Sequence, residues 1–448
     1  MSLGLLRRQQ NNAMGMVVLF LLGGTFLYGM LTRNIDWLQI LMALFTVYAL
    51  VMLISPLVFR EREVARNDFY RPFVTILVPA KNEEDVIGNT ILSLSKLHYY
   101  RNGRPNYEII IIDDASTDGT TQIVMQLERK FDFLSVIHRP PGGLTGKAAA
   151  LNAGLLHARG EVIAVFDADS DVNPDFLLKS IPLLFDEKIA GIQGRVKLYN
   201  PNENLVTRLQ NDEFIIFNHL TQKGKDVLRG VTCLGGNGQL VKRQALDIVG
   251  GWNEESLTED FDLTFRLLLH GYQVRYAEHA ILWQEAVHTW KRLFRQRTRW
   301  GEGLLTSMFD FFLPVLSAKM SFTQRIDAIL TLTRILLPFW VIASYFYEII
   351  GLAKHVVFYS SITPLYLALL TAAFFITMAW SVMKILPSKP MTTASRVVQY
   401  WLYAVVWILV LPISYLNYFK TSRAVFWDKT HHRGVEIEQL PSQTSVLT

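Results

Sequence analysis

The chain has 448 residues, half of them hydrophobic, and 44 lysine and arginine residues against 39 aspartate and glutamate residues give a formal net charge of +5. The basic residues are scattered and no nucleic-acid motif is present, so the charge favours phosphates or anionic headgroups over nucleic acid as partners. The single cysteine, Cys233, excludes an intrachain disulfide and a thiolate metal cluster, which fits a cytosolic domain. Hydrophobic runs lie toward both ends and charged residues fill the middle, which indicates a soluble domain between membrane segments.

Two apolar runs near the start, residues 14–31 and 37–59, are each long enough to cross the ~30 Å hydrocarbon layer as a helix. They predict a transmembrane hairpin within residues 1–60, with Arg7 and Arg8 in the cytoplasm beside the basic middle domain. A cleaved signal peptide is the alternative for the first run. That run is long for a signal, lacks a small-x-small cleavage site and is followed at once by another span. We therefore expect an integral protein of the plasma or inner membrane with a cytosolic middle domain.

Three further apolar runs follow the middle domain, at residues 328–353 (interrupted by Arg334), 356–385 and 397–419. Three crossings would place the basic residues of the tail outside, against the positive-inside rule. The basic residues concerned are Lys420, Arg423, Lys429 and Arg433. Either one segment is re-entrant or interfacial, or residues 356–385 cross twice, and the sequence leaves these alternatives open. The predicted order is interfacial helices at 286–325, transmembrane helices at 326–420 and a tail at 421–448.

Within residues 61–285, β-branched apolar runs alternate with amphipathic segments. This alternation predicts an α/β fold, with a mainly parallel sheet that is covered by helices on both faces. Ligands of such sheets bind beyond the C-terminal ends of the strands, where this chain places its polar clusters. The expected strands are residues 73–80, 107–112, 134–138 and 162–166, and the expected helices are residues 86–97, 120–130 and 147–158.

Two acidic pairs follow two of these strands. Asp167 and Asp169 come after the strand at 162–166, and their hard oxygen atoms suit Mg²⁺ or Mn²⁺. Capping of a following helix is the alternative role for this pair. Asp113 and Asp114 come after the strand at 107–112, and adjacent carboxylates repel unless they bind a ligand such as ribose or uracil, or are balanced by a cation.

A lysine and a short acidic motif complete the polar clusters. Lys147 begins a helix after a glycine-rich loop that is not a Walker A sequence, and it can reach a diphosphate at the helix N-terminus; a solvated lysine is the alternative. Thr258, Glu259 and Asp260 precede the amphipathic residues 261–269. An N-capped helix start explains these residue types, with Thr258 as the cap, but it is compatible with a general base, the role that we assign to Asp260.

A basic helical segment from Trp290 onward contains Gln296, Arg297, Arg299 and Trp300. A snorkelling interfacial helix explains the abundance of arginine and tryptophan. It does not explain why Gln296, Arg299 and Trp300 share one helical face at spacings of three and four residues. Arg299 suits neutralisation of a departing phosphate, and Trp300 offers a flat apolar surface to a sugar ring.

In this order, the motifs between about Phe73 and Trp300 resemble the family 2 inverting glycosyltransferases. The likeness is strongest to the membrane-integrated branch that contains cellulose, hyaluronan, chitin and poly-N-acetylglucosamine synthases. The resemblance implies a GT-A (Rossmann-like) fold, a UDP-sugar donor and a divalent cation, Mg²⁺ or Mn²⁺. Residues 232–239 depart from the acceptor motif of cellulose synthases, and their Gly-Asn-Gly-Gln is closer to membrane enzymes that glucosylate diacylglycerol.

The resemblance also implies roles for individual residues. Pro79, Ala80, Lys81, Asn82 and Glu83 would begin the uridine pocket, Asp113 and Asp114 would complete it, Lys147 would contact the diphosphate, and Asp167 and Asp169 would hold metal and donor. Asp260, with Glu259 beside it, would be the base, and Gln296, Arg299 and Trp300 match the family's Gln-x-x-Arg-Trp. Residues 427–430 resemble a short motif that follows the last membrane helix of many relatives.

Three functions follow from these assignments. The first is processive synthesis of an extracellular β-linked polysaccharide, in which Asp260 deprotonates the acceptor while the metal, Lys147 and Arg299 stabilise departing UDP. The second is the same inverting chemistry on a glycerolipid such as diacylglycerol. The third is a non-catalytic membrane protein that binds nucleotide sugar, which the acidic residues at the strand ends disfavour.

Overall fold

The structure is a computed structural model that describes residues 3–59, 66–142, 146–358, 364–386 and 390–419. Contacts divide the chain into two units. A helical unit contains residues up to Glu61, Lys223–Val231 and Phe294–Arg423, and a sheet unit contains Arg62–Gln222 and Thr232–Leu293. The predicted motif at 427–430, the basic tail residues and most of the glycine-rich loop before Lys147 lie outside the described residues.

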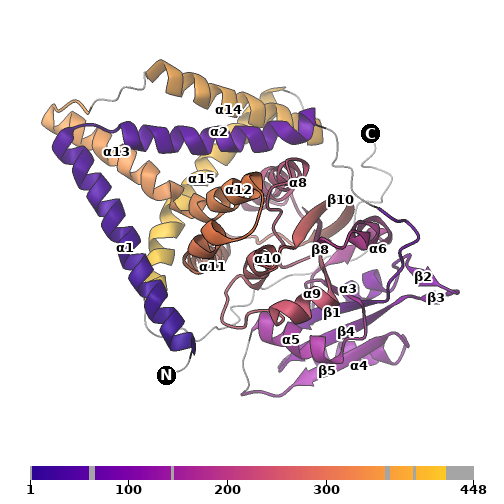
Figure 1. Ribbon diagram of the computed structural model, residues 1–448. Coiled ribbons are helices and arrows are strands. Elements are labelled where there is room, and N and C mark those ends of the chain that lie inside the picture. The colour runs from indigo at the N-terminus through magenta and orange to yellow at the C-terminus, as the bar shows by residue number, and fades with distance from the viewer. Residues whose placement is uncertain (1–2, 60–65, 143–145, 359–363, 387–389, 420–448) are drawn as a thin grey trace. The chain divides into compact units, whose positions relative to one another are not determined.

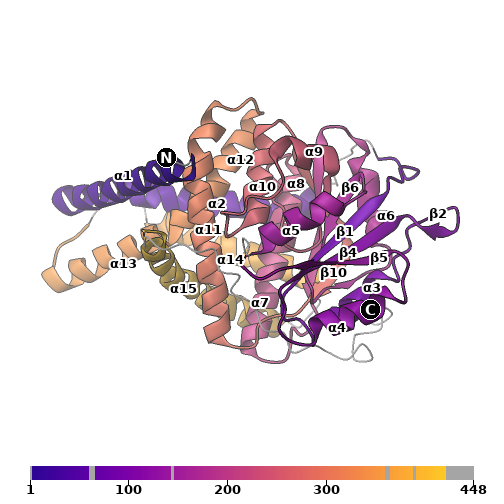
Figure 2. The ribbon, with the colours of Figure 1, turned by 90° about the horizontal axis from the view of Figure 1, so that it is seen from below.

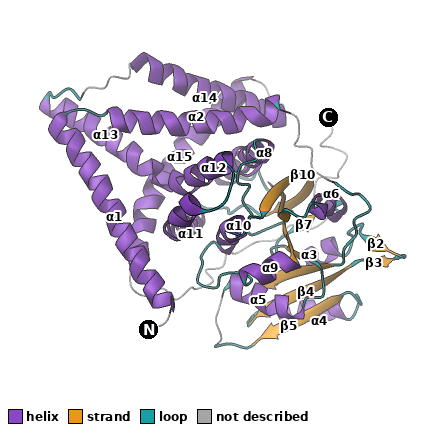
Figure 3. Cartoon of the chain, viewed as in Figure 1, coloured by secondary structure: helices purple, strands orange, loops and turns teal. Residues whose placement is uncertain are grey.

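The sheet unit is built on one twisted sheet, which Figures 1 and 3 show edge-on among its helices. Its eight strands lie in the order β5-β4-β1-β6-β9-β8-β10-β7. The pairs β5/β4, β4/β1, β1/β6 and β8/β10 are parallel, and the pairs β6/β9, β9/β8 and β10/β7 are antiparallel. The strands are β1 (Val74–Ala80), β4 (Tyr107–Asp114), β5 (Leu134–Arg139), β6 (Val162–Val165), β7 (Asp171–Val172), β8 (Ile189–Leu198), β9 (Gln239–Lys242) and β10 (Gln273–Gln284), and a separate hairpin pairs β2 (Tyr100–Arg101) with β3 (Arg104–Pro105).

The central strands of this sheet, such as β1 and β4, are buried along their whole length because helices cover both faces. One core joins the sheet to α3 (Ile87–Leu94), α4 (Thr120–Glu128), α6 (Phe176–Ser180) and the 3₁₀ helix η1 (Ile181–Phe185). The other core joins it to α5 (Lys147–His157), α9 (Arg243–Val249) and α10 (Glu259–Leu269). In Figure 2 the strands β1, β4 and β5 lie side by side between α5 and α3. The predicted α/β fold with a mainly parallel sheet is confirmed.

Three consecutive helical segments follow β8: α7 (Leu205–Glu213), the π-helix η2 (Phe214–Thr221) and α8 (Gln222–Val227). Asn204 begins α7 with a capping box, in which its side chain accepts from the backbone of Thr207 and the Thr207 hydroxyl accepts from the backbone of Asn204. The π-helix packs against β8. Residues Lys223–Val231 belong to the helical unit, although the residues before and after them belong to the sheet unit.

The helical unit contains long apolar helices. They are α1 (Leu3–Thr32), α2 (Asp36–Val58), most of α11 (Trp290–Ser317), α12 (Phe322–Thr333), α13 (Leu337–Lys354), α14 (Pro364–Ile385) and α15 (Pro390–Phe419). In the part of the chain that the structure describes, three helical stretches are long and apolar enough to cross a membrane: Asp36–Val58, Phe322–Lys354 and Met391–Phe419. The apolar stretches Phe20–Thr32 and Leu369–Ile385 are shorter. The predicted interruption at Arg334 is a 3₁₀ turn, η3 (Arg334–Leu336), between α12 and α13.

A buried polar cluster connects three segments of the helical unit. The Asp327 carboxylate on α12 accepts hydrogen bonds of 2.6 Å from the Tyr48 hydroxyl on α2 and from the Val231 backbone. Lys225 Nζ on α8 lies 3.6 Å from the same carboxylate and donates to Thr331 Oγ1. The side chains of Lys225 and Asp327 are 3% and 5% exposed, so both charges depend on their partners inside the protein.

Candidate active site

The C-terminal ends of β4, β1 and β6 bring the predicted donor-binding residues to one edge of the sheet. Ala80, the last residue of β1, pairs in parallel with Asp113, and β6 ends at Val165, two residues before Asp167. This edge is where ligands bind in open parallel sheets. The structure therefore collects the predicted residues between Pro79 and Asp169 on the sheet unit.

Asp113 is buried and held by several donors. Its carboxylate accepts from the Ser116 backbone at 3.0 Å and from the Thr121 hydroxyl at 2.6 Å, and it lies 3.2 Å from the His138 ring. Burial alone would raise the pKa of Asp113, but the hydrogen bonds from Ser116, Thr121 and His138 outweigh it and lower the pKa. Asp113 is therefore ionised and rigid at neutral pH.

Asp114 beside it is compensated by cations. Its carboxylate forms ion pairs with Arg139 at the end of β5 and with Lys81, whose Nζ lies 3.5 Å away. The repulsion expected between Asp113 and Asp114 is thus relieved by separate partners on either side. Arg139 was not among the predicted site residues, and it lies at the same edge because β5 pairs with β4.

The predicted segment from Pro79 to Glu83 is fixed to the loop after β4. Asn82 has a positive φ of 53°, and its side-chain oxygen accepts from the Thr117 backbone at 2.7 Å. The backbone of Glu83, a buried residue, donates to Thr120 Oγ1 at 2.7 Å. A left-handed conformation suits asparagine better than most residues, so this turn places Lys81 beside Asp114 at little cost.

Lys147 is the residue on which the acidic motifs converge. Its ammonium group forms an ion pair with Asp167, donates to the Gly236 carbonyl at 2.7 Å and lies 3.8 Å from Glu259 Oε1. Burial would lower the pKa of Lys147, but Asp167 and Glu259 outweigh it and raise the pKa. The alternative of a solvated lysine is wrong. Two motifs about ninety residues apart in the sequence meet at this one cation.

Asp260 lies beside that cation in a desolvated position. Burial and the neighbouring Glu259 raise the pKa of Asp260 to about 7, although Lys147 and the Phe261 backbone N–H act in the opposite direction. A carboxyl group with a pKa near neutrality is suited to general acid–base chemistry, because both protonation states are accessible at working pH.

The helix-start alternative holds in part for the second acidic motif, since α10 begins at Glu259 with Glu259 and Asp260 in its first turn. Thr258 occupies the N-cap position of α10, but its side chain makes no capping hydrogen bond, and its buried hydroxyl has no partner in the described part of the chain. Asp167 and Asp169 are followed by strand β7 and not by a helix. An unpartnered buried hydroxyl next to two carboxylates is a position where a ligand group can complete the hydrogen bonding.

The loop before β9 connects these motifs. The Asn237 side chain accepts from the Asp167 backbone at 3.2 Å and from Ser170 Oγ at 3.0 Å, and it donates to Gln284 Oε1 at 2.9 Å. Its carbonyl accepts from Gln193 on β8 at 2.9 Å. Asn237 therefore fixes the position of the Asp167–Asp169 turn relative to the loop that carries Gly236.

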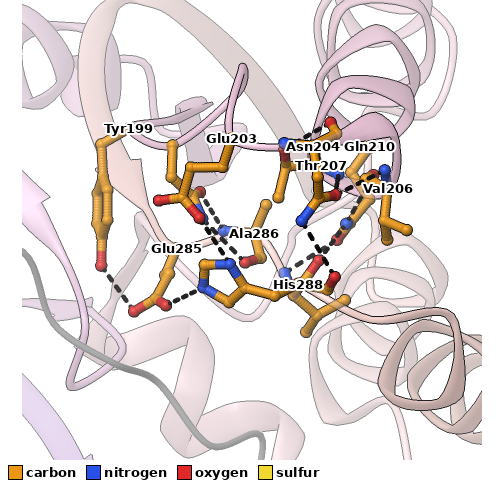
Figure 4. A network of polar contacts seen from close by, with 11 residues as sticks. Tyr199, Glu203, Asn204, Val206, Thr207, Gln210, Glu285, Ala286 and His288 are labelled. Atoms are coloured by element: carbon orange, nitrogen blue, oxygen red, sulfur yellow. Dashed lines mark hydrogen bonds and ion pairs between the residues drawn. The ribbon is translucent and has the colours of Figure 1, made fainter.

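A carboxylate and histidine network supports Asp169. The Glu285 backbone donates to Asp169 Oδ2 at 3.0 Å. The Glu285 side chain accepts from the Tyr199 hydroxyl at 3.1 Å, as Figure 4 shows. His288 lies between two carboxylates, 2.6 Å from Glu285 Oε1 through Nε2 and 2.7 Å from Glu203 Oε2 through Nδ1. The His288 ring thus contacts one carboxylate through each of its two nitrogens and joins Glu203 to Glu285.

Residues Gln296, Arg299 and Trp300 lie on α11 in the helical unit. Arg297, which is fully buried, donates to Gln296 Oε1 at 2.5 Å and stacks over the Trp300 ring at 4.0 Å from its centroid. One face of the indole is thus occupied by a cation, a contact that the sequence analysis did not foresee. That Gln296, Arg299 and Trp300 act together with Asp260 stays a prediction.

Comparison with known proteins agrees with this geometry. The family model described as glycosyltransferase like family 2 matches residues 71–303, which is more than half of the chain. The chain belongs to glycosyltransferase family 2. The matched range includes every predicted site residue of this transferase, from Pro79 to Trp300.

Two curated relatives of the transferase differ in the products that their names state. A β-monoglucosyldiacylglycerol synthase from Nostoc sp. is 42% identical over 268 residues, which cover 60% of this chain and 56% of the relative. A poly-β-1,6-N-acetyl-D-glucosamine synthase from Staphylococcus epidermidis is 27% identical over 252 residues, which cover 55% of this chain and 58% of the relative. The chain thus spans a little over half the length of these relatives.

A solved structure supports the fold of the transferase. The mannosyltransferase from Pyrobaculum calidifontis, in complex with GDP-mannose and Mn²⁺, aligns with a TM-score of 0.56 and 19% identity, covering 85% of this chain and 98% of that one. At this identity the likeness concerns the fold alone, and it agrees with the predicted GT-A fold.

Several residues of the candidate site were not predicted from the sequence: Arg139, Gln193, Tyr199, Asn237, Glu285 and His288. The Gly-Asn-Gly-Gln stretch was noted only for its likeness to glycolipid enzymes, yet its asparagine is the residue that joins two motifs. The spacing of Glu285 and His288, three residues apart, offered a weak signal. Such a pair becomes informative only when the fold places it behind Asp169.

Proposed function

We propose that this transferase moves a hexosyl group from a UDP-sugar to an acceptor hydroxyl with inversion, forming a β-glycosidic bond. The observation that carries the proposal is the meeting of Asp167, Glu259 and Asp260 around Lys147. Lys147 at the start of α5 can exchange its carboxylate partners for the donor diphosphate, to which the helix N-terminus adds its own attraction. Asp260 is then the adjacent group that removes the acceptor proton.

A single displacement explains why the site needs no covalent nucleophile. The Asp260 carboxylate accepts the proton of the acceptor hydroxyl while the acceptor oxygen attacks the anomeric carbon from the face opposite to UDP. The Gly236 backbone and Glu259 fix Lys147, which stabilises the charge that develops on the departing diphosphate. Arg299 and Trp300 are proposed to complete the leaving-group and acceptor sides, as their motif implies.

The carboxylates fit a divalent cation. The described residues contain no group of three or more histidine, cysteine, aspartate or glutamate side chains arranged around a metal position. Magnesium and manganese sites at nucleotides need only one or two protein carboxylates, since substrate phosphates and water complete the shell. Asp167, partly exposed, and Asp169, oriented by Glu285, supply such a pair. The bound ion would neutralise the diphosphate oxygens.

The acceptor is proposed to be a membrane lipid of the diacylglycerol type. The 42% identity to a β-monoglucosyldiacylglycerol synthase favours this second sequence hypothesis over the first, polysaccharide synthesis, which has the 27% identity to a poly-N-acetylglucosamine synthase. The helical stretches able to cross a membrane fit an enzyme that acts at the bilayer in either case. The family membership favours both enzymatic hypotheses over a non-catalytic protein.

The test is incubation of the purified full chain, in nanodiscs containing diacylglycerol, with Mn²⁺ or Mg²⁺ and each of a panel of labelled UDP-sugars. We expect label in the organic-extractable lipid fraction, in a product cleaved by a β-glycosidase. Label in high-molecular-weight polymer would instead support polysaccharide synthesis. The absence of transfer from every donor to either fraction would refute the proposed function.

A further inference from the structure

One face of β8 carries two cations beyond the residues assigned above. From Ile192 onward the strand alternates, so that Gly194 and Val196 face the core beneath α6. Gln193, Arg195 and Lys197 therefore face the opposite side. Gln193 on that side accepts from the Gly235 backbone at 2.6 Å, which places this face of β8 directly beneath the site loop.

The neighbouring strand adds an aromatic surface to this face. In the parallel pairing of β8 with β10, Ile281 is the partner of Arg195 and Trp283 is the partner of Lys197. Register partners point to the same side of a sheet, and Lys197 Nζ lies 5.9 Å from the centroid of the Trp283 ring. The two cations are thus arranged in line with Gln193 and bordered by an indole.

Arg195 and Lys197 have no close ion-pair partner in the described part of the chain. Neither forms a hydrogen bond or an ion pair with a described residue, although Tyr276 and Glu278 are close enough to act electrostatically on Arg195. Burial lowers the pKa of Arg195, and burial together with the neighbouring Arg195 lowers the pKa of Lys197 to about 8. Two half-buried cations on one strand face repel each other, which is costly unless an anion binds between them.

We propose that Arg195, Lys197 and Trp283 form a binding site for a phosphate group next to the loop Gly235–Gln239. A phosphate matches the pair because the guanidinium can bind two of its oxygens while the ammonium contributes a point charge. The identity of the phosphate-bearing ligand rests on the proposed function. Since diacylglycerol and sugar acceptors are neutral, the phosphate belongs either to the nucleotide donor or to the headgroup of a membrane phospholipid.

The first test uses the unaltered full chain and needs no turnover. Lys197, with its lowered pKa, has more free amine near pH 7.5 than an ordinary lysine and reacts faster with a limiting amount of acetic anhydride. The extent of acetylation is measured by mass spectrometry in phosphatidylcholine nanodiscs, with and without UDP and Mn²⁺, and in nanodiscs containing phosphatidylglycerol. Lys188, an exposed lysine just before β8, is the control.

Each outcome has a definite meaning. Protection of Lys197, but not of Lys188, by UDP assigns the site to the donor, and protection by phosphatidylglycerol assigns it to a lipid headgroup. An acetylation rate of Lys197 that neither probe changes would overturn the proposal. Protection in a chain that shows no transfer with any donor would leave the phosphate site standing and refute only the proposed function.

Variants give an independent measurement. Arg195→Gln and Lys197→Gln should each weaken UDP binding, or the stimulation of transfer by phosphatidylglycerol, by about tenfold, whereas Lys188→Gln should change neither. Lys197→Arg should restore most of the effect, because it returns the charge. Equal behaviour of Lys197→Gln and Lys188→Gln in folded protein would contradict the assignment.

Discussion

Asp260 and Glu259 are adjacent carboxylates that share one cation, Lys147, and this arrangement gives the two groups different roles. Glu259 lies 3.8 Å from Lys147 and is buried, while Asp260 has its pKa raised to about 7 by burial and by Glu259. When two like charges occupy one desolvated site, the second group to ionise holds its proton more tightly. Asp260 is therefore the group that exchanges a proton near neutral pH.

Replacing Asp260 by asparagine should remove the base but keep the shape of the site. We expect transfer to fall by at least about 10²-fold while UDP binding, measured by calorimetry with Mn²⁺, is retained. Glu255→Gln, at an exposed position shortly before α10, is the control for loss of a nearby acid. Substantial turnover by Asp260→Asn would remove Asp260 from the role of base.

The pH dependence of transfer should report the same group. A base works as the anion, so kcat/KM should fall as the pH drops through the pKa of Asp260, about 7. Glu259→Gln removes the like charge that raises this pKa, so its acid limb should lie at lower pH. The measurement is the pH profile of kcat/KM for the two proteins. A limb that stays in place, or moves to higher pH, would show that Glu259 does not set the titration.

His288 joins two carboxylates behind Asp169. Without its ring, Glu285 and Glu203 lose the side chain that contacts both of them, and the Glu285 backbone that donates to Asp169 loses its support. His288→Ala should therefore raise the Mn²⁺ concentration needed for half-maximal UDP binding by about 10-fold or more, as for other groups that orient metal ligands. His98→Ala, at an exposed ion pair elsewhere in the sheet unit, is the control. An unchanged Mn²⁺ requirement would contradict this role.

At the scale of elements, the conformation of the loop Gly235–Gln239 requires a residue without a side chain at Gly236. A Cβ built at Gly236 would lie 2.9 Å from Lys147 Nζ and 3.6 Å from Asp260 Oδ2, whereas one at Gly235 would have its nearest neighbour at 3.5 Å. The loop backbone thus approaches the charged groups as closely as glycine permits.

Two alanine substitutions one residue apart test this loop. Gly236→Ala should displace Lys147 and lower kcat by about tenfold or more with little change in thermal stability, because the contact is local. Gly235→Ala should retain near-normal kcat, since its methyl group meets only ordinary contacts. Both kcat and the melting temperature are to be measured. A normal kcat for Gly236→Ala would show that the loop yields without affecting the lysine.

The elements that sequence patterns predicted are those with strong local signals. The β-branched runs of β1, β4 and β6, the amphipathic α4 and the helix α5 lie within a few residues of their expected bounds. In contrast, β8 is interrupted by glycine, glutamine, arginine and lysine, and β9 has only four residues, so neither has a clear period. The insertion of β9 between β6 and β8 depends on long-range pairing, which local patterns do not encode.

The same distinction applies to the site. Motifs such as Asp167–Asp169 and Glu259–Asp260 are short and acidic, so they can be recognised and assigned a chemistry from the sequence. The residues that support them act through the fold. Asn237 meets the Asp167 turn because β9 enters the sheet beside β6, and Glu285 meets Asp169 because β10 pairs with β7. No sequence spacing predicts these contacts.

At the scale of the whole molecule, the buried cluster of Lys225, Asp327 and Tyr48 ties an internal segment into the helical unit. This segment, Lys223–Val231, lies in the sequence between two stretches of the sheet unit. Gly224 beside it approaches α2 so closely that a Cβ would lie 2.3 Å from the Met52 carbonyl. The ion pair and this close contact together fix α8 against α2 and α12.

Breaking the ion pair from one side should be costly. Lys225→Met leaves Asp327 buried without its cation and should destabilise the helical unit by about 3–5 kcal/mol, measured as a loss of thermal stability in detergent. The double variant Lys225→Met/Asp327→Asn removes both charges and should recover part of the loss, and Lys319→Met at an exposed position should have no effect. A double variant that is less stable than either single variant would show that the pair is not the source of the stability.

The assignment of Lys223–Val231 to the helical unit bears on how this enzyme can be divided. The segment lies between Gln222 and Thr232, both of which belong to the sheet unit, and it leads directly into the loop whose Gly236 carbonyl binds Lys147. A fragment limited to the sheet unit therefore cannot be excised by trimming the two ends of the chain, since nine residues of the helical unit would remain inside it without their partners on α2 and α12. Genetic separation of the two units would require the redesign of that internal segment.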